Sequence, residues 1–201
     1  VEKYLRDTLD SVLRQTFADF ELILVDDCSK DGSGKICDEV AASDGRVRVI
    51  HKEKNGGASS ARNLGTKSAS GKYLYYMDSD DKIDSDIFEK MYSASRDASP
   101  TVVMFGAVEE YYDKTGKLYM TNPVSYESKA LSGKENVAKE VIKIENTTLF
   151  GYLWNKIYLK DAVLSSGVTF CDMPLNEDFK FNIDFFRYVD SMVILDDTAY
   201  H

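Results

Sequence analysis

The sequence predicts an α/β fold built on a mostly parallel, doubly wound sheet that is flanked by helices. The first observation is that short apolar runs alternate with helix-like segments through about residues 1–105, a pattern typical of parallel sheets with right-handed crossovers. The second is that two of these runs stop in clustered carboxylates, at Asp26-Asp27 and at Asp78-Ser79-Asp80-Asp81. Because ligands of open α/β sheets lie beyond the carboxyl ends of the strands, these ends point to a site.

The elements of the first half follow from periodicity. Leucine and valine side chains recur at helical spacing and predict an amphipathic helix over residues 2–15. Residues 20–25 form an apolar run that ends in carboxylates and a turn at Asp31-Gly32, and they predict a buried strand. The same alternation predicts helices around residues 36–41, 58–69 and 87–95, and strands at residues 47–50, 73–77 and 101–105.

The second half, about residues 106–201, is organised differently. Aromatic residues surround a turn at Thr115-Gly116 and predict a hairpin or a loop. We further expect helices at residues 134–144 and 177–188, an apolar and basic segment at residues 154–159, and a strand at residues 192–195. Tyrosine rings suit stacking on sugars or bases, although packing is the simpler interpretation of any single one.

Composition excludes several classes of protein. The 201 residues fit one domain with a substantial core. With 25 basic and 34 acidic residues, the chain lacks the basic surface that a general nucleic-acid binder needs. The three cysteines include no C-x-x-C pair, so we expect no disulfide framework or zinc site and a reducing, cytoplasmic setting. No apolar run is long enough to cross a bilayer, which leaves peripheral action at the inner face of the membrane open.

Asp78 and Asp80 lie two apart on an extended chain and therefore point the same way. Carboxylates this close repel each other unless a cation or a proton relieves them. The economical hypothesis is a divalent cation with hard oxygen ligands, Mg²⁺ or Mn²⁺, that neutralises a phosphate-bearing substrate. The alternative is a solvated turn that leads into a helix with an acidic first turn, since Asp and Ser favour helix caps.

Four segments also occur in a recognisable order. They are residues 17–33, residues 55–63, residues 71–81 and Asn176-Glu177-Asp178-Phe179. Together they closely resemble family 2 glycosyltransferases of the GT-A fold. The resemblance implies a Rossmann-like sheet with a smaller acceptor-side lobe: a nucleotide-sugar-binding half over about residues 1–105 and an acceptor-binding half over about residues 106–201. The family opens with a hydrophobic strand and this chain starts after it, so we expect the first strand of the fold to be missing.

The resemblance implies an enzyme of the hexosyltransferase type. Such an enzyme moves a sugar from a nucleotide donor, expected here to be a UDP-sugar, to an acceptor hydroxyl with inversion. The expected partners are this donor and a saccharide or lipid-linked saccharide acceptor, in the synthesis of bacterial cell-surface polysaccharide. A single displacement needs one base and no enzyme nucleophile. The acceptor, the donor sugar and the oligomeric state do not follow from the sequence.

Position by position, the resemblance places the donor nucleotide near Asp26, Asp27, Asn55, Gly57 and Arg62. Asp27 matches the carboxylate that accepts a hydrogen bond from the uracil N–H, although it or Asp26 could equally cap the next helix. Arg62 matches a basic position where a guanidinium pairs with phosphate oxygens, and a surface helix charge is the alternative. Gly57 lets the backbone approach the nucleotide, which an ordinary turn would also require.

The remaining matches concern the chemistry. Asp78 and Asp80 match the D-x-D motif that holds the diphosphate through Mn²⁺ or Mg²⁺, with Asp80 as the direct ligand. Asp81 is expected to contact the donor sugar or to cap the next helix. Asp178 matches the catalytic base, and Glu177 beside it is the alternative base or an orienting residue. Both are also explained as acidic residues in the first turn of a helix.

Other classes of function fit the sequence less well. The stretch Asp27-x-Ser29-x-Asp31-Gly32 with Asp38 approximates a calcium-binding EF-hand loop, but it follows a strand-like run rather than a helix. A catalytically inactive domain of the same fold would bind nucleotide or sugar without transfer. A dinucleotide-dependent oxidoreductase is disfavoured because no G-x-G-x-x-G follows a predicted strand.

Overall fold

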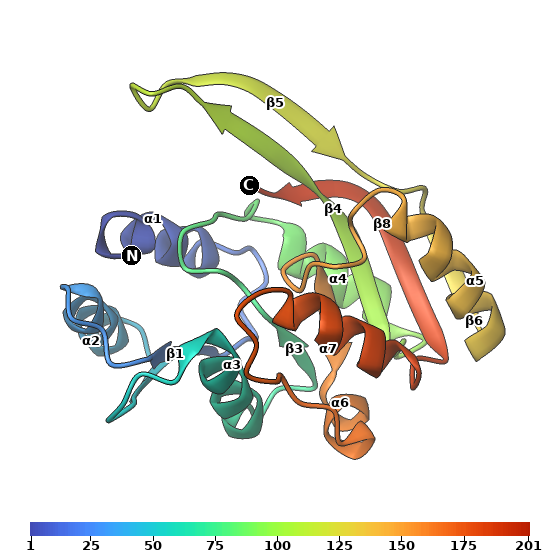
Figure 1. Ribbon diagram of the computed structural model, residues 1–201, viewed down its shortest axis with the longest axis horizontal. Helices are drawn as coiled ribbons and strands as arrows, with labels where there is room; N and C mark the ends of the chain where they lie inside the picture. The colour runs from blue at the N-terminus through green and yellow to red at the C-terminus, as the bar shows by residue number, and fades with distance from the viewer.

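The computed structural model describes residues 1–201 and confirms the α/β class, with a central mixed sheet flanked by helices (Figure 1). The helices are α1 (Glu2–Leu13), α2 (Ser33–Ser43), α3 (Gly57–Ser68), α4 (Ile87–Arg96), α5 (Lys134–Glu145), α6 (Lys160–Ser166) and α7 (Glu177–Phe186). The strands are β1 (Leu22–Asp26), β2 (Val47–His51), β3 (Tyr73–Tyr75), β4 (Val102–Tyr112), β5 (Leu118–Val124), β6 (Lys129–Ser132), β7 (Lys156–Leu159) and β8 (Ser191–Tyr200). All the helices and strands expected from periodicity are present, and β6, β7 and α6 are additional. None of the helices is both long and apolar enough to span a membrane.

The strand pairing corrects the expectation of a mostly parallel sheet. Only β1–β2 and β4–β8 are parallel, whereas β3–β7, β4–β7, β4–β5 and β6–β8 are antiparallel. The reason is that β7, from the second half of the chain, lies between β3 and β4 in the order β3-β7-β4-β8-β6. Strands β1 and β2 form a separate two-stranded sheet, so β1 has a partner on one side only. Its residues are consequently half-buried, not buried as expected.

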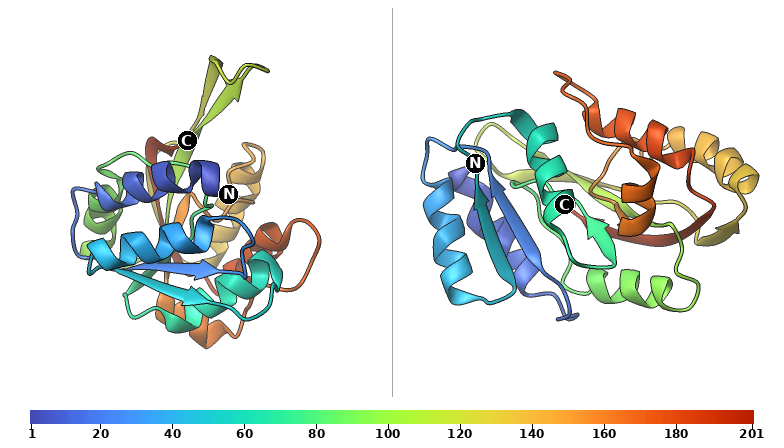
Figure 2. Two further views of the ribbon diagram at one scale, coloured as in Figure 1. Left: turned by 90° about the vertical axis from the view of Figure 1, so that its left-hand side faces the viewer. Right: turned by 90° about the horizontal axis from the view of Figure 1, so that it is seen from below.

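Strand β4 lies at the centre of the core, because its side chains alternate between two hydrophobic clusters. Val102 and Met104 belong to the larger cluster, which also contains residues of α5, α6 and α7. Val103 and Phe105 belong to a second cluster with residues of α1 and α4. The right-hand view of Figure 2 shows α4 and α7 on opposite sides of the central strands. The sheet is therefore buried on both faces along the first half of β4.

Phe185 tests how much the helix packing contributes to stability. Its side chain is fully buried in the larger cluster, with the ring of Tyr158 at a centroid distance of 5.8 Å. We expect Phe185→Ala to lower the free energy of unfolding by about 3–5 kcal/mol in urea titrations, because burial is lost and a cavity remains. In the control Tyr112→Ala, where the side chain is exposed, the change should stay within about 0.5 kcal/mol. Similar losses in both variants would contradict this assignment of the core.

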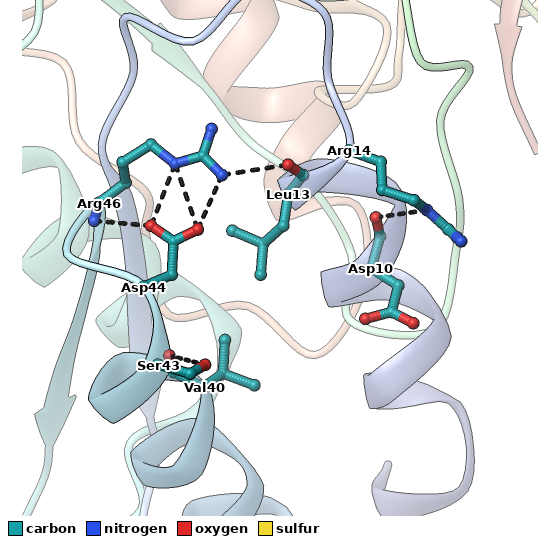
Figure 3. Close-up of polar contacts among 7 residues, drawn as sticks. All are labelled: Asp10, Leu13, Arg14, Val40, Ser43, Asp44 and Arg46. Atoms are coloured by element: carbon teal, nitrogen blue, oxygen red, sulfur yellow. Dashed lines mark hydrogen bonds and ion pairs between the residues drawn. The ribbon is translucent and has the colours of Figure 1, made fainter.

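Arg46 ties the small β1–β2 sheet to the end of α1 (Figure 3). Its guanidinium pairs with Asp44 at 2.7 Å, donates to the backbone oxygen of Leu13 at 3.1 Å and lies 4.5 Å from the ring centroid of Phe20. Hydrogen bonds from Arg46 lower the pKa of Asp44 to about 2. These contacts fix the sheet whose first strand ends in Asp26.

Strands β4 and β5 form a long hairpin that projects from the body of the protein (Figures 1 and 2). It confirms the turn expected at Thr115-Gly116, where Gly116 has a φ of +82°. Gly106 is crowded by backbone where this hairpin leaves the core. A Cβ added there would lie 2.3 Å from the backbone oxygen of Val124 and 3.0 Å from that of Asp197. Only a residue without a side chain fits this position without a backbone shift.

Candidate active site

Asp27 follows the end of β1 and is held by the loop that opens α3. Its carboxylate accepts the N–H groups of Gly56 at 3.0 Å and Gly57 at 2.7 Å, and it pairs with the ammonium of Lys52. The side chain of Asn55 donates to the backbone oxygen of Asp27 at 3.0 Å. Burial raises the pKa of Asp27, but the hydrogen bonds from Lys52 and the glycines outweigh it and leave the pKa below its usual value. Three predicted donor-binding residues, Asp27, Asn55 and Gly57, thus form one group.

Asp26, the last residue of β1, makes a different set of contacts. Its carboxylate accepts the N–H of Ser29 at 3.0 Å and lies 2.9 Å from Nδ1 of His51. The other ring nitrogen of His51 lies 2.9 Å from Asp38 on α2. The hydrogen bonds to Asp26 and Asp38 raise the pKa of His51 above its ordinary value of 6.5. The contacts of Asp26 shown here fasten β1, β2 and α2 together, and its role in binding the donor stays a prediction.

This bridge predicts a dependence of stability on pH. Because the folded-state pKa of His51 is raised, its contribution is fully present below pH 6.5 and is lost as the pH rises through the raised value. We expect the free energy of unfolding to fall as the pH rises from 6.5 through the raised pKa of His51, and His51→Gln to lose this part of the curve. Urea titrations across this range measure it. An unchanged slope in His51→Gln would contradict the assignment.

Arg62, on α3, joins the two halves of the chain. Its guanidinium donates to Asp78 after β3 at 3.0 Å and to Glu177 at the start of α7 at 2.7 Å. It also lies 5.7 Å from the ring centroid of Phe170. Burial alone would lower the pKa of Arg62, but attraction to Asp78 and hydrogen bonds to both acids outweigh it and raise the pKa above its usual value. Residues from three of the four sequence segments that predicted the site therefore meet at one guanidinium.

Asp78, Asp80 and Asp81 form an acidic loop between β3 and α4. Burial is the largest cause that raises the pKa of Asp78, Arg62 opposes it, and the charges of Asp80 and Asp178 raise it further. Burial also raises the pKa of Asp81, whose carboxylate accepts the hydroxyl of Tyr200 at 2.6 Å. Asp80 is exposed. The cluster thus has more negative charge than the protein neutralises, and Asp80 is the acid most open to a ligand.

Glu177 and Asp178 open α7, as expected for acids near the positive end of a helix dipole. Asn176 before them adopts a left-handed conformation with a φ of +63°, which is uncommon for a residue other than glycine. Glu177 is bound to Arg62, whereas Asp178 accepts the N–H of Phe179 at 2.8 Å. The charge of Asp178 also raises the pKa of Asp78, so the two carboxylates lie near each other. The geometry gives Glu177 an ion pair and leaves Asp178 without one.

The acidic loop fits a divalent cation. No group of three or more His, Cys, Asp or Glu side chains is arranged to hold a metal by itself. Mg²⁺ and related cations need only one or two carboxylates when phosphate oxygens supply further ligands. Asp80 and Asp78 are the residues that could supply these carboxylates, and a cation would relieve the repulsion that adds to the effect of burial on the pKa of Asp78.

Two contributors to the site were not identified from the sequence. Tyr200 binds Asp81 from the end of β8, and its position depends on the parallel β4–β8 pairing, which no local pattern reveals. Lys52 follows β2 and pairs with Asp27, which follows β1. The parallel pairing of β1 with β2 brings these ends together, so neighbouring strand ends were the signal that could have found Lys52.

The sequence of this chain matches a known protein family. The sequence model described as "Glycosyl transferase family 2" matches residues 1–162. The uncharacterized glycosyltransferase EpsJ of Bacillus subtilis is 32% identical over all 201 residues, which span 57% of EpsJ. The minor teichoic acid biosynthesis protein GgaB of the same organism is 43% identical over 93 residues, 45% of this chain and 10% of GgaB.

A solved structure shares the fold. S. aureus TarS in complex with UDP-GlcNAc superposes with a TM-score of 0.77 over 99% of this chain and 54% of TarS, at 23% identity. The chain thus spans about half the length of EpsJ and of this TarS structure. The fold, the family match over 162 residues and the similarity to EpsJ along the whole chain lead to one conclusion: this chain belongs to glycosyl transferase family 2.

Proposed function

We propose that this chain forms the catalytic part of a glycosyltransferase that uses a nucleotide sugar, specifically a UDP-sugar, and inverts the anomeric centre. The observation that carries the proposal is Arg62, which binds Asp78 from the first half of the chain and Glu177 from the second. This contact sets the acidic loop beside the start of α7. Such an arrangement suits a reaction between a diphosphate-bearing donor, held by residues 1–105, and an acceptor held by residues 106–201.

Each group then has a chemical task. Asp27, fixed by Lys52 and Gly57, offers a carboxylate edge to the N–H of a uracil ring. Asp80, with Asp78, would hold Mn²⁺ or Mg²⁺, and such a cation supplies the positive charge that stabilises a departing diphosphate. Arg62, which binds Asp78, would pair with the oxygens of the same phosphates.

Asp178 is the proposed base. It takes the proton of the acceptor hydroxyl as that oxygen bonds to the anomeric carbon, and the bond from this carbon to the diphosphate breaks with its electron pair on the leaving nucleotide. Glu177 is the weaker candidate because Arg62 binds its carboxylate. Asp81, held by Tyr200, lies in the same loop as Asp78 and Asp80 and is proposed to contact the donor sugar.

The biological setting is proposed from the relatives. GgaB is named for teichoic acid biosynthesis, and TarS binds UDP-GlcNAc, so a saccharide or lipid-linked saccharide acceptor in bacterial cell-surface polysaccharide synthesis fits best. The free cysteines Cys28, Cys37 and Cys171 suit a reducing cytoplasm, and a lipid-linked acceptor would bring the protein to the inner face of the membrane.

A thermal-shift screen tests the proposal on the full-length protein. UDP, UDP-GlcNAc, UDP-glucose and GDP-mannose are each added with and without Mn²⁺. A ligand at 100 times its dissociation constant stabilises the folded state by about 2.7 kcal/mol, which raises the melting temperature measurably. We expect UDP-sugars with Mn²⁺ to give the largest increase in melting temperature. Release of UDP, followed with the same donors, distinguishes an enzyme from a binding-only domain. Ca²⁺ is also added alone, and stabilisation by Ca²⁺ with no response to any nucleotide would overturn the proposal.

A further inference from the structure

A fully buried lysine lies next to the candidate active site, and the proposed chemistry does not use it. Lys156, at the start of β7, has no exposed surface. Its ammonium donates to the backbone oxygens of Leu149 at 2.8 Å and Tyr152 at 2.7 Å, and to Oδ1 of Asn155 at 2.6 Å. These three acceptors match the three hydrogens of a charged ammonium group. Lys156 therefore binds both ends of the turn at residues 149–152.

Asn182 on α7 binds the same turn from the other side. Its amide nitrogen lies 3.0 Å from the oxygen of Phe150, 2.9 Å from that of Gly151 and 3.0 Å from that of Tyr152. The hydroxyl of Tyr158 donates to its Oδ1 at 2.8 Å, which fixes the orientation of the amide. Four consecutive backbone oxygens thus converge on two buried side chains, Lys156 and Asn182, which we call the carbonyl clamp.

The carbonyl clamp is not expected to add much to the free energy of unfolding. Burial lowers the pKa of Lys156 well below the ordinary lysine value, because the charged form loses its hydration. Buried charges can often be replaced by apolar groups of similar volume without loss of stability. The turn also follows Thr148, a β-branched residue with a φ of +66°, a strained conformation of the kind that gathers at functional sites.

The position of the turn suggests what the clamp does instead. On one side it packs against the first turn of α7: a Cβ added to Gly151 would lie 3.0 Å from the ring of Phe179, next to Asp178. Asn182 lies four residues after Asp178, so both lie on the same face of the helix. The clamp therefore holds the helix that carries the proposed base.

On the other side the turn leads into a column of stacked rings. Tyr152 stacks on Trp154 with centroids 4.5 Å apart, and Trp154 stacks on Tyr200 at 4.2 Å. The hydroxyl of Tyr200 donates to Asp81 in the acidic loop at 2.6 Å. One continuous set of contacts thus runs from the start of α7, through the clamped turn, to the acidic loop.

We propose that Lys156 is a positioning residue, which fixes the distance between the acid groups of α7 and those of the acidic loop by holding the 149–152 turn between them. Because it has no exposed surface, it is not assigned a contact with donor or acceptor. The catalytic consequence rests on the proposed glycosyl transfer, whereas the structural consequence, a fixed turn and ring column, does not.

The first test needs no substrate, because Trp154 is the single tryptophan of the chain. Lys156→Met keeps most of the length of the side chain and removes the ammonium group. In this variant we expect acrylamide to quench Trp154 at least about twofold more efficiently, as the released turn opens to solvent. The control is Val163→Ala, which truncates a buried side chain of the same core on α6. Quenching in this control should remain as in the wild-type protein.

The second test separates positioning from general destabilisation. The dissociation constant for UDP should stay within about threefold in Lys156→Met, because the clamp shares no contact with the group around Asp27. Release of UDP from the donor found in the screen should slow by roughly 100-fold through kcat, since displacements near 1 Å have such effects. Val163→Ala should slow it far less. Failure of the wild-type protein to use any donor would refute the proposed function. The quenching of Trp154 would still test whether Lys156 holds the 149–152 turn, because that measurement needs no substrate.

Two outcomes would overturn the inference. One is wild-type quenching of Trp154 in Lys156→Met, and the other is a loss of turnover no larger than that of Val163→Ala. If Lys156→Met does not fold, Tyr158→Phe takes its place, because it removes only the hydroxyl that orients Asn182. We expect smaller changes in the same direction, and quenching and turnover unchanged from wild type would again overturn the inference.

Discussion

Asp178→Asn is expected to bind the donor nucleotide as tightly as the wild-type protein and to lose nearly all sugar transfer. The substitution keeps the shape of the side chain and removes its ability to take a proton. General base catalysis contributes about 10²–10⁴-fold, so kcat should fall by that factor. UDP binding by calorimetry, together with UDP release in a coupled assay, measures the two effects separately.

Glu177→Gln is the matched control for this experiment. Glu177 is bound to Arg62, so its substitution should disturb the guanidinium and weaken binding of the donor phosphates. The base assignment would be reversed if Glu177→Gln lost turnover with unchanged UDP binding while Asp178→Asn transferred sugar at the wild-type rate. Both variants replace a carboxylate by the corresponding amide, at neighbouring positions on α7.

Asp80→Ala is expected to abolish the part of donor binding that depends on Mn²⁺. The exposed carboxylate of Asp80 is the acid most available to a cation, because Arg62 binds Asp78 and Tyr200 binds Asp81. Without it, the positive charge that stabilises the leaving diphosphate is lost, and transfer should fall by at least about 10²-fold. Titrations of UDP-sugar with and without Mn²⁺ measure the effect on binding.

Asp97→Ala is the charge-matched control, since Asp97 is an exposed acid after α4 whose ion pair is with Arg96. It should leave both titrations unchanged. A Mn²⁺ effect of wild-type size in Asp80→Ala would show that the cation is held by other residues, and the D-x-D interpretation would be wrong.

Most of the fold was predictable because helix and strand periodicities are local properties of the sequence. The helices that begin at Glu2, Lys134 and Glu177 start within one residue of the expected positions. Strand order was not predictable in the same way. The insertion of β7 between β3 and β4 depends on contacts between residues far apart in the chain, and a run of four residues gives no sign of its partners.

The candidate site was also predictable only in part. Carboxylates at strand ends indicated the acidic loop, and the structure brings Asp78 and Glu177 to Arg62 although more than 100 residues separate Arg62 from Glu177. The parts that the sequence did not reveal depend on tertiary contacts. Tyr200 gains its partner Asp81 only when β8 lies beside β4, and Lys52 gains Asp27 only when β2 pairs with β1.

Gly106 has a consequence for the mechanics of the projecting hairpin. At this point the backbones of the β4, β5 and β8 regions come so close that no side chain separates them. The direction in which the hairpin leaves the body is therefore set by main-chain contact at a single pivot. Any larger residue there would force the three backbones apart and change the direction of the hairpin, whereas substitutions at the tip of the hairpin would leave this direction unchanged.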